Sequence, residues 1–274
     1  MKKTLITLIG LAAVISAQPV LGQTLVFSEN FDALSNGTNA TTSNTTLTYA
    51  RIGSGGGVIQ SLSPGNFGTG ASAVVTMTTS STSLNGIGVQ STLPASTVYT
   101  LSLNIRPTNL SGDFVLGLGN GASFTGNSTF AGSHGLFWLQ SDNGNFQRRA
   151  TSGSWTNIGG NTTLAINTNY ALHVIANGSG SAVTYSGGNV AAGMMDIYLN
   201  GALLDDDVAV TTNGLSATGF RMYQVSQGNF EVDNIQIWNG AVATEAVPEP
   251  STWALIGIGS AFLLWRIRRK NSAV

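Results

Sequence analysis

Apolar and polar side chains alternate with a period of two along much of the chain between residues 24 and 243, and this alternation constrains the fold more than any other feature. In the segment 97–106, TVYTLSLNIR, the alternation is regular. One face carries Tyr99, Leu101, Leu103 and Ile105, and the other carries Val98, Thr100, Ser102 and Asn104. A period of two places successive side chains on opposite faces of a strand. The segment is therefore predicted to be a half-buried strand of an antiparallel sheet.

The same interpretation applies to eight further segments, and no segment between them has a convincing helical period. They are 25–28 (LVFS), 72–78 (SAVVTMT), 113–119 (DFVLGLG), 134–140 (HGLFWLQ), 170–176 (YALHVIA), 195–200 (MDIYLN), 219–225 (GFRMYQV) and 230–238 (FEVDNIQIW). Asn200-Gly201 and Asp142-Asn143-Gly144 suit the positive φ angles of tight hairpin turns. Together these features predict an all-β fold, a two-sheet antiparallel jelly-roll sandwich. A β-solenoid is the rival, but no fixed repeat period supports it.

The composition allows a substantial core but leaves the surface almost uncharged. Hydrophobic residues make up 42% of the 274 residues and charged residues only 8%, compared with about 25% in a typical soluble domain. The chain has no cysteine, so disulfides cannot stabilise it. Stability must come from a large sheet core, to which a bound ion could contribute.

All three lysines and three of the eight arginines lie at the two ends of the chain. The stretch 23–250 contains twelve carboxylates, five arginines and no lysine, which gives a net charge of −7. A nucleic-acid partner would require cations that neutralise a run of phosphates. The acidic body therefore predicts that nucleic acid is not a partner.

The N-terminus has the order of features of a secretory signal peptide. Lys2 and Lys3 precede an apolar run from Leu5 to Ala17, and Ala17 or Gly22 would suit cleavage. We predict that residues 1–22 form a helical signal peptide that directs export.

The C-terminus combines a proline motif, a short apolar run and a basic cluster. The motif is Val247, Pro248, Glu249 and Pro250, the apolar run extends from Trp253 to Trp265, and the cluster contains Arg266, Arg268, Arg269 and Lys270. Residues 252–265 would form about 21 Å of helix, which is shorter than a hydrocarbon core of about 30 Å. The two tryptophans suit the membrane interfaces, and the basic cluster suits the cytoplasmic side. The run predicts a short transmembrane helix.

This segment resembles the PEP-CTERM sorting signal of exported proteins in Gram-negative bacteria. In that family the motif, the apolar run and the basic cluster follow one another at the C-terminus, as they do over 247–274 here. The resemblance implies that a membrane enzyme, an exosortase, recognises and cleaves the motif. The protein would pass through a cytoplasmic-membrane intermediate to the cell surface or extracellular matrix. A plain, uncleaved tail anchor is the alternative.

The body resembles the concanavalin A-like lectin/glucanase sandwich, in its laminin-G-like branch. The resemblance rests on the segments 25–34 (LVFSENFDAL), 99–107 (YTLSLNIRP), 194–204 (MMDIYLNGALL) and 230–240 (FEVDNIQIWNG). It implies that residues 23–240 form one sandwich whose first and last strands are adjacent. Residues 241–246 would then be a tether to the sorting signal.

Glucanases of that family carry the motif Glu-x-Asp-x-x-Glu, whose carboxylates serve as nucleophile and acid/base. The corresponding stretch here is 231–236 (EVDNIQ), and its third position is Gln236, which cannot exchange a proton. His134 and His173 each lie singly in an apolar stretch, which favours packing over catalysis or zinc binding. The chain is therefore predicted not to be an enzyme.

Three carboxylates are candidates for a structural calcium site. Glu29 and Asp32 belong to the first predicted strand and Asp233 to the last, so pairing of those strands would bring them together. Calcium requires several oxygen ligands of this kind. Separately solvated carboxylates are the alternative.

Aromatic rings that face solvent are the expected contacts for a polysaccharide. The available rings are Trp138, Trp155, Tyr223 and Trp238, and the available donors are Arg148 and Arg149. Trp155, in the loop-like stretch TSGSWTN, lacks apolar neighbours and is the best candidate. Core packing is the alternative role for each ring.

These features predict a non-catalytic, exported protein of the cell surface or extracellular matrix that binds polysaccharide. Two alternatives stay open. One is a secreted glycoside hydrolase of the same fold, and the other is a purely structural or adhesive module.

Overall fold

The computed structural model describes residues 23–52, 56–68, 70–77, 84–123, 132–151, 153–224 and 227–244. The predicted signal peptide (1–22), sorting signal (247–274) and short transmembrane helix lie outside the described residues. Among the residues that are described, none forms a helix with the length and hydrophobicity that a bilayer span requires.

The described residues form seventeen strands and two 3-10 turns. The larger sheet contains β1 (Thr24–Glu29), β3 (Ile59–Leu62), β4 (Ser72–Met77), β6 (Val98–Asn109), β11 (Tyr170–Asn177), β14 (Met194–Leu199), β15 (Ala202–Ala209) and β17 (Gly228–Asn239). The smaller sheet contains β2 (Tyr49–Arg51), β5 (Asn85–Val89), β7 (Phe114–Gly119), β8 (Gly135–Asp142), β9 (Asn145–Arg149), β10 (Trp155–Asn157) and β16 (Gly219–Gln224). The remaining elements are β12 (Val183–Tyr185), β13 (Gly188–Val190), η1 (Gly121–Ser123) and η2 (Gly132–His134).

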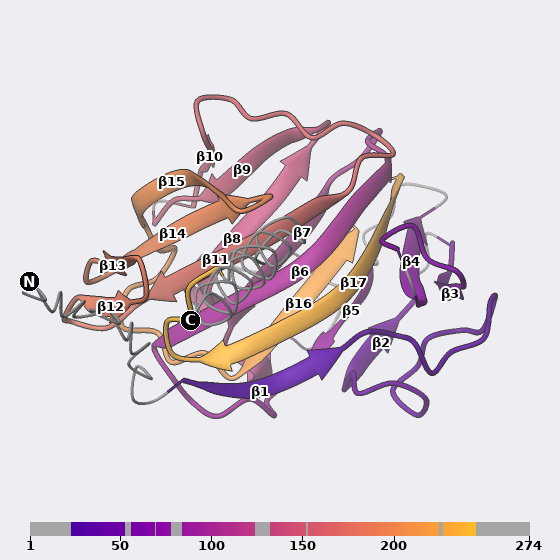
Figure 1. Ribbon diagram of the computed structural model, residues 1–274, viewed down its shortest axis with the longest axis horizontal. Coiled ribbons are helices and arrows are strands. Elements are labelled where there is room, and N and C mark those ends of the chain that lie inside the picture. Colours follow the sequence, from indigo (N-terminus) through magenta and orange to yellow (C-terminus); the bar gives the residue numbers. More distant parts are fainter. Residues whose placement is uncertain are drawn as a thin grey trace, which may run out of the picture.

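Two antiparallel sheets stack into a sandwich, which confirms the predicted all-β fold (Figure 1). The eight-stranded sheet has the order β15-β14-β11-β6-β17-β4-β3, and β1 also pairs with β17. The seven-stranded sheet has the order β10-β9-β8-β7-β16-β5-β2, and β12 pairs with β13 in a separate hairpin.

The core between the sheets follows from the alternation in the sequence. The apolar face predicted for 97–106 is buried, because none of its four side chains is more than 2% exposed. It shares one core cluster with residues of the opposite sheet, among them Leu116, Leu118, Phe137, Leu139, Phe220 and Met222. Burial of each large apolar side chain contributes about 1.5–3 kcal/mol, so a chain without disulfides can be stabilised by this layer.

Both predicted hairpin turns are present. Asn143 and Gly144, between β8 and β9, have φ angles of 48° and 89°, and Asn200 and Gly201, between β14 and β15, have φ angles of 53° and 79°. Two successive positive φ angles match the twist of the flanking strands. The turn residues therefore fix how these strands pair.

The first and last strands are neighbours, as the resemblance implied. β1 pairs with the C-terminal half of β17, from Thr24 opposite Asn239 to Glu29 opposite Ile235, and β4 pairs with its N-terminal half. Asn234 has a φ of 50° and lies at a register shift between β17 and β6. A bulge of this kind bends a strand, and it separates the parts of β17 that pair with β4 and with β1 (Figure 1).

Strand β5 has no counterpart among the predicted strands. Its sequence, NGIGV, contains two glycines that show no side-chain alternation. A Cβ on Gly86 would lie 2.7 Å from Cβ of Tyr223, and one on Gly88 would lie 2.3 Å from the carbonyl oxygen of Phe220. The glycines are therefore required by close approach to β16.

Part of the segment expected to be a tether is packed against the body. Residues 240–244, which we call the strap, lie on the outer face of the eight-stranded sheet. Ala241 is only 2% exposed and packs with Ile175, Tyr185 and Val190. Residues 241–244 therefore belong to the fold, and a tether can begin only after Thr244.

Candidate functional site

The outer face of the seven-stranded sheet, which points away from the other sheet, gathers aromatic and arginine side chains. We call it the aromatic face and define it by Tyr49 of β2, Trp138 of β8, Arg149 of β9, Trp155 of β10, and Arg221 and Tyr223 of β16. Arg221, for example, lies between Phe220 and Met222, which both point into the core. Successive side chains of a strand point to opposite faces, so Arg221 points outward.

Trp155 lies at the edge of the aromatic face, on strand β10, and its side chain is half-exposed. Because β10 pairs with β9, Trp155 lies opposite Arg149, whose guanidinium carbon is 5.6 Å from the ring centroid. This distance is within the range of a cation–π contact. The ring also packs against a buried cluster of Leu84, Val115, Trp138 and Tyr223. Trp155 is therefore held from beneath while part of it stays accessible.

Arg221 lies at the centre of the aromatic face and is only 1% exposed. Its Nη2 donates a hydrogen bond of 2.7 Å to the hydroxyl of Tyr49. Its guanidinium carbon is 4.4 Å from the ring centroid of Tyr49 and 5.1 Å from that of Tyr223. Burial lowers the pKa of Arg221 from its ordinary value, and the two tyrosines oppose this effect. The side chain keeps its charge because the ordinary pKa of arginine is above 12.

A row of amides crosses the three strands next to the tryptophans. Nε2 of Gln140 donates to Oε1 of Gln147 at 2.6 Å, and Nε2 of Gln147 donates to Oδ1 of Asn157 at 2.8 Å. Nδ2 of Asn157 donates in turn to Oδ1 of Asn161. Each amide donates one N–H to the oxygen of the next amide, so all of them point in one direction along the row. Each amide NH₂ also keeps a second N–H, and each oxygen a second lone pair, for a ligand.

Two glycines allow Trp138 to lie flat on the sheet. A Cβ on Gly117 would lie 2.5 Å from Cε3 of Trp138, and a Cβ on Gly135 would lie 1.8 Å from its Nε1. Real side chains cannot approach this closely, so any larger residue at either position would displace the ring. The glycines therefore fix the position of the Trp138 ring, against which Trp155 packs.

The structure brings together three of the four rings considered in the sequence. Trp138, Trp155 and Tyr223 share the aromatic face, whereas Trp238 lies on the eight-stranded sheet. The expectation that Trp155 lacks apolar neighbours is wrong, because its neighbours come from other strands. Arg148 also does not join Arg149, since it points to the other side of β9 and donates to the carbonyl oxygen of Ala209 at 3.4 Å.

Asp113 and Asp142 form a carboxyl pair at one end of the same face. Asp113 lies two residues before Val115, and Asp142 two residues after Gln140, which pairs with Val115. Burial raises the pKa of Asp113 to about 6, and the charge of Asp142 and the hydrogen bond between the two side chains contribute. A pair in direct contact is closer than the about 5 Å that separates the carboxyl groups of retaining glycosidases.

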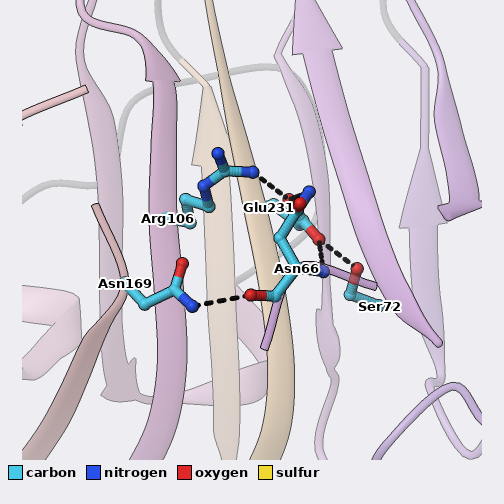
Figure 2. Close-up of polar contacts among 5 residues, drawn as sticks. All are labelled: Asn66, Ser72, Arg106, Asn169 and Glu231. Carbon is cyan, nitrogen blue, oxygen red and sulfur yellow. Dashed lines mark hydrogen bonds and ion pairs between the residues drawn. The ribbon is translucent and has the colours of Figure 1, made fainter. Parts of the chain in front are cut away.

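Glu231, from the stretch that resembles the glucanase motif, is a buried hydrogen-bond acceptor (Figure 2). Its Oε1 accepts from the backbone N–H of Asn66 at 2.9 Å and from the hydroxyl of Ser72. Its Oε2 accepts from Nδ2 of Asn66 at 2.7 Å and from Nη1 of Arg106 at 3.5 Å. Asn169 donates to the carbonyl oxygen of Asn66 at 2.6 Å. The carboxylate therefore joins β17 to β4, β6 and the loop around residue 66.

Two of the predicted calcium ligands are also bound to backbone amides. Oε1 of Glu29 accepts from the N–H of Phe31 at 2.8 Å, and its Oε2 accepts from the N–H of Thr46 at 2.6 Å. Oδ1 of Asp32 accepts from the N–H of Ala71 at 2.9 Å. These bonds hold the loops that follow β1 and precede β4.

Asp233, the third predicted ligand, is 4% exposed and accepts the N–H of Asn234 at 2.7 Å. Its pKa is raised to about 7, first by burial and also by the nearby charges of Asp32, Glu231 and Glu29, against the effect of the bond to Asn234. Within the described ranges, no three or more His, Cys, Asp or Glu side chains are arranged to hold a metal ion. The residues as placed therefore do not fit a calcium cage.

The two histidines differ in setting. His173 of β11 is buried, and its Nε2 donates to the carbonyl oxygen of Val242 at 2.9 Å. Its ring meets Tyr198 edge to face, with centroids 5.9 Å apart. Burial lowers the pKa of His173, and the bond to Val242 opposes this effect. His134 is half-buried at the end of η2.

Residues 246–270 match the PEP-CTERM protein-sorting motif. The match confirms the sorting signal that the sequence predicted at 247–274. It indicates an exported protein of the cell envelope or surface that an exosortase sorts and processes.

The body is similar to solved β-sandwich structures. A sialidase matches with 9% identity and a TM-score of 0.48, over 74% of this chain, which spans only 18% of the sialidase. Domain 4 of an extracellular arabinanase from Geobacillus stearothermophilus, solved with arabinotriose, has 17% identity and a TM-score of 0.45, over 80% of this chain and 94% of the domain. An alginate lyase has 14% identity and a TM-score of 0.41, over 77% and 95% of the two chains. No curated protein matches the sequence.

Proposed function

We propose that this protein is a non-catalytic component of the cell surface or extracellular matrix of a Gram-negative bacterium, and that it binds polysaccharide through the aromatic face. The body is, in this proposal, a concanavalin A-like sandwich. The observation that carries the binding proposal is the half-exposed ring of Trp155, supported by Trp138 and flanked by Arg149 and the amide row.

This arrangement has the two components that recognition of a sugar chain requires. An aromatic ring offers a rigid apolar surface for the C–H face of a sugar, at a low entropic cost. Polar groups around it fix orientation by hydrogen bonds to hydroxyl groups. Arg149 supplies guanidinium donors directly across from Trp155 on β9, and the next pair on this face of the same two strands, Gln147 and Asn157, supplies amides.

Replacement of Trp155 by alanine is expected to weaken polysaccharide binding by at least about tenfold, because buried tryptophan contacts at interface centres typically contribute more than about 2 kcal/mol. The measurement is affinity electrophoresis of the fragment 23–246 in gels that contain extracellular polysaccharide from the producing bacterium. Trp238→Ala, on the other sheet, is the matched control and should bind like the wild type. Equal loss in both variants would place the contact elsewhere. Correct surface localisation without binding to any polysaccharide would instead support a structural or adhesive module.

The tail is proposed to be a temporary signal that an exosortase removes. Mass spectrometry of the mature surface form should therefore show that the peptide from Trp253 to Lys270 is missing. A Pro248→Ala variant should keep this peptide and accumulate in the cytoplasmic membrane. If the wild-type surface form retains the peptide, the tail is a plain anchor.

A glycoside hydrolase is the second candidate, and the carboxyl pair on the aromatic face favours it. Asp113, with its pKa raised to about 6, has the protonation behaviour of a general acid. The contact with Asp142 leaves no room for a sugar between the two groups, which favours the non-catalytic proposal. Reducing-sugar release from the same polysaccharide by the fragment 23–246, abolished in Asp113→Asn or Asp233→Asn, would establish the hydrolase.

A further inference from the structure

The strap ties the C-terminal end of the body to the outer face of the eight-stranded sheet. The N–H of Gly240 donates to the carbonyl oxygen of Val98 at 3.0 Å. The hydroxyl of Thr100 donates to the carbonyl oxygen of Gly240 at 2.8 Å and accepts from the N–H of Val242 at 2.9 Å. His173 then donates to the carbonyl oxygen of Val242 at 2.9 Å. Two side chains from neighbouring strands therefore hold consecutive parts of the strap.

Thr100 is fully buried beneath the strap. Its hydroxyl has one donor and can also accept, so one oxygen satisfies two backbone groups of the strap. The side-chain amide of Gln23 donates to the carbonyl oxygen of Ala241, and Ala241 packs with Ile175 and Tyr185. Hydrogen bonds and apolar contacts together hold the strap in place.

The sorting motif begins three residues after the strap ends. An extended chain spans at most about 3.6 Å per residue, so Val247 lies within about 11 Å of Thr244, and Pro250 within about 22 Å. Thr252, where the apolar run begins, lies within about 29 Å by the same measure. A domain of this size has a radius of gyration of about 17 Å. The body is therefore wider than the stretch of chain between Thr244 and Thr252. While the strap is docked, the body stays close to both the motif and the membrane segment.

We propose that the docked strap restricts the access of the processing enzyme to the Val247–Pro250 motif, with Thr100 and His173 as positioning residues that set this restriction. The inference rests on the proposed removal of the tail by a membrane enzyme. Release of residues 240–244 lengthens the connection by up to about 18 Å, which lets the body move away from the motif. The fraction of molecules with a released strap then sets the rate at which the tail is removed.

The test compares two substitutions at Thr100 in the full chain, expressed in the producing bacterium. Thr100→Val keeps the shape of the side chain but leaves the carbonyl oxygen of Gly240 and the N–H of Val242 unpaired, whereas Thr100→Ser keeps the hydroxyl and is the matched control. Loss of two such hydrogen bonds should raise the released fraction by at least about fivefold. We expect the rate of tail removal in a pulse–chase experiment to rise by that factor for Thr100→Val and to stay at the wild-type value for Thr100→Ser.

A second variant lengthens the connection without a change in the body. A flexible Gly/Ser insertion of six residues after Thr244 adds reach whether or not the strap is docked. It should accelerate tail removal as much as Thr100→Val does, and Thr100→Val should add nothing in the presence of the insertion. This arm also tests the proposal if Thr100→Val lowers the amount of folded protein.

The possible outcomes separate the inference from the proposed function. If the wild-type tail is never removed, the proposed processing is wrong before any variant is compared. If the wild-type tail is removed but the insertion does not accelerate removal, the restriction by the strap is wrong. Equal acceleration by Thr100→Val and Thr100→Ser would also overturn the role of the Thr100 hydroxyl.

Discussion

Glu231→Gln should lower the free energy of unfolding of the body by about 3–5 kcal/mol, the loss expected when one partner of a buried ion pair is removed. Glu231 is fully buried, and the side chain of its partner Arg106 is 18% exposed. A glutamine has the same shape but presents an N–H₂ group where one carboxylate oxygen accepts hydrogen bonds. The N–H₂ group of the glutamine would therefore point at donors of Asn66 or Ser72, and neither side would have an acceptor. Unpaired buried donors are costly.

The measurement is urea unfolding of the fragment 23–246. Arg106→Gln is the companion variant, because it removes the charge partner but leaves the other three donors to Glu231 in place. It should cost less than Glu231→Gln, and the double variant should lose less than the sum of the two single losses. A Glu231→Gln variant as stable as the wild type would contradict the structural role of this carboxylate and would reopen the comparison with the glucanase motif.

Periodicity predicted the strands in which side chains alternate, and it failed where side chains are absent or the strand is short. The segment 97–106 shows its period directly, and the structure buries the predicted face. In β5, Gly86 and Gly88 carry no side chain, so the sequence holds no periodic signal there. The need for these glycines comes from Tyr223 and Arg221 on the neighbouring strand, which is a tertiary cause that no local pattern contains.

The sequence identified single aromatic residues of the candidate site, but it could not show that they gather on one face of a sheet. Trp155 has polar neighbours in the sequence, and its apolar neighbours come from β7, β8 and β16. The amide row offered a signal that the sequence interpretation missed. A two-residue turn at Asn143-Gly144 pairs Asp142 with Asn145, and counting outward by two residues then pairs Gln140 with Gln147. Hairpin register alone would therefore have found the first hydrogen bond of the row.

Adjacent terminal strands were enough to predict that Glu29, Asp32 and Asp233 approach one another. The sequence could not show what else reaches these groups. The N–H of Thr46 and the N–H of Ala71 come from loops whose path depends on the whole fold. These amides bind the same carboxylate oxygens that a cation would need, so in the structure the convergence forms a hydrogen-bonded cluster.

Asp233→Asn should stabilise the body at pH 8 by about 2–4 kcal/mol and have little effect near pH 4. The folded-state pKa of about 7 lies above the unfolded value of about 3.9. Below pH 4 the carboxyl is protonated in both states, so it imposes no penalty on folding. As the pH rises from 4 to 7 the unfolded state ionises first, and stability falls by up to about 1.4 kcal/mol per pH unit. Above pH 7 the penalty stays constant. Asparagine keeps an oxygen for the N–H of Asn234 and removes the charge.

The two proteins are compared by urea unfolding of the fragment 23–246 at pH 4 and pH 8, with Asp205→Asn, on the half-exposed β15, as the control that should change little at either pH. Each protein is also measured at pH 8 with millimolar calcium and with a chelator. We expect calcium to leave the wild type unchanged, because Glu29, Asp32 and Asp233 already accept backbone amides. A bound cation would have the opposite effect, since it would keep Asp233 ionised and reverse the sign of the substitution. Stabilisation of the wild type by calcium, lost in Asp233→Asn, would therefore show that these carboxylates rearrange into a cation site.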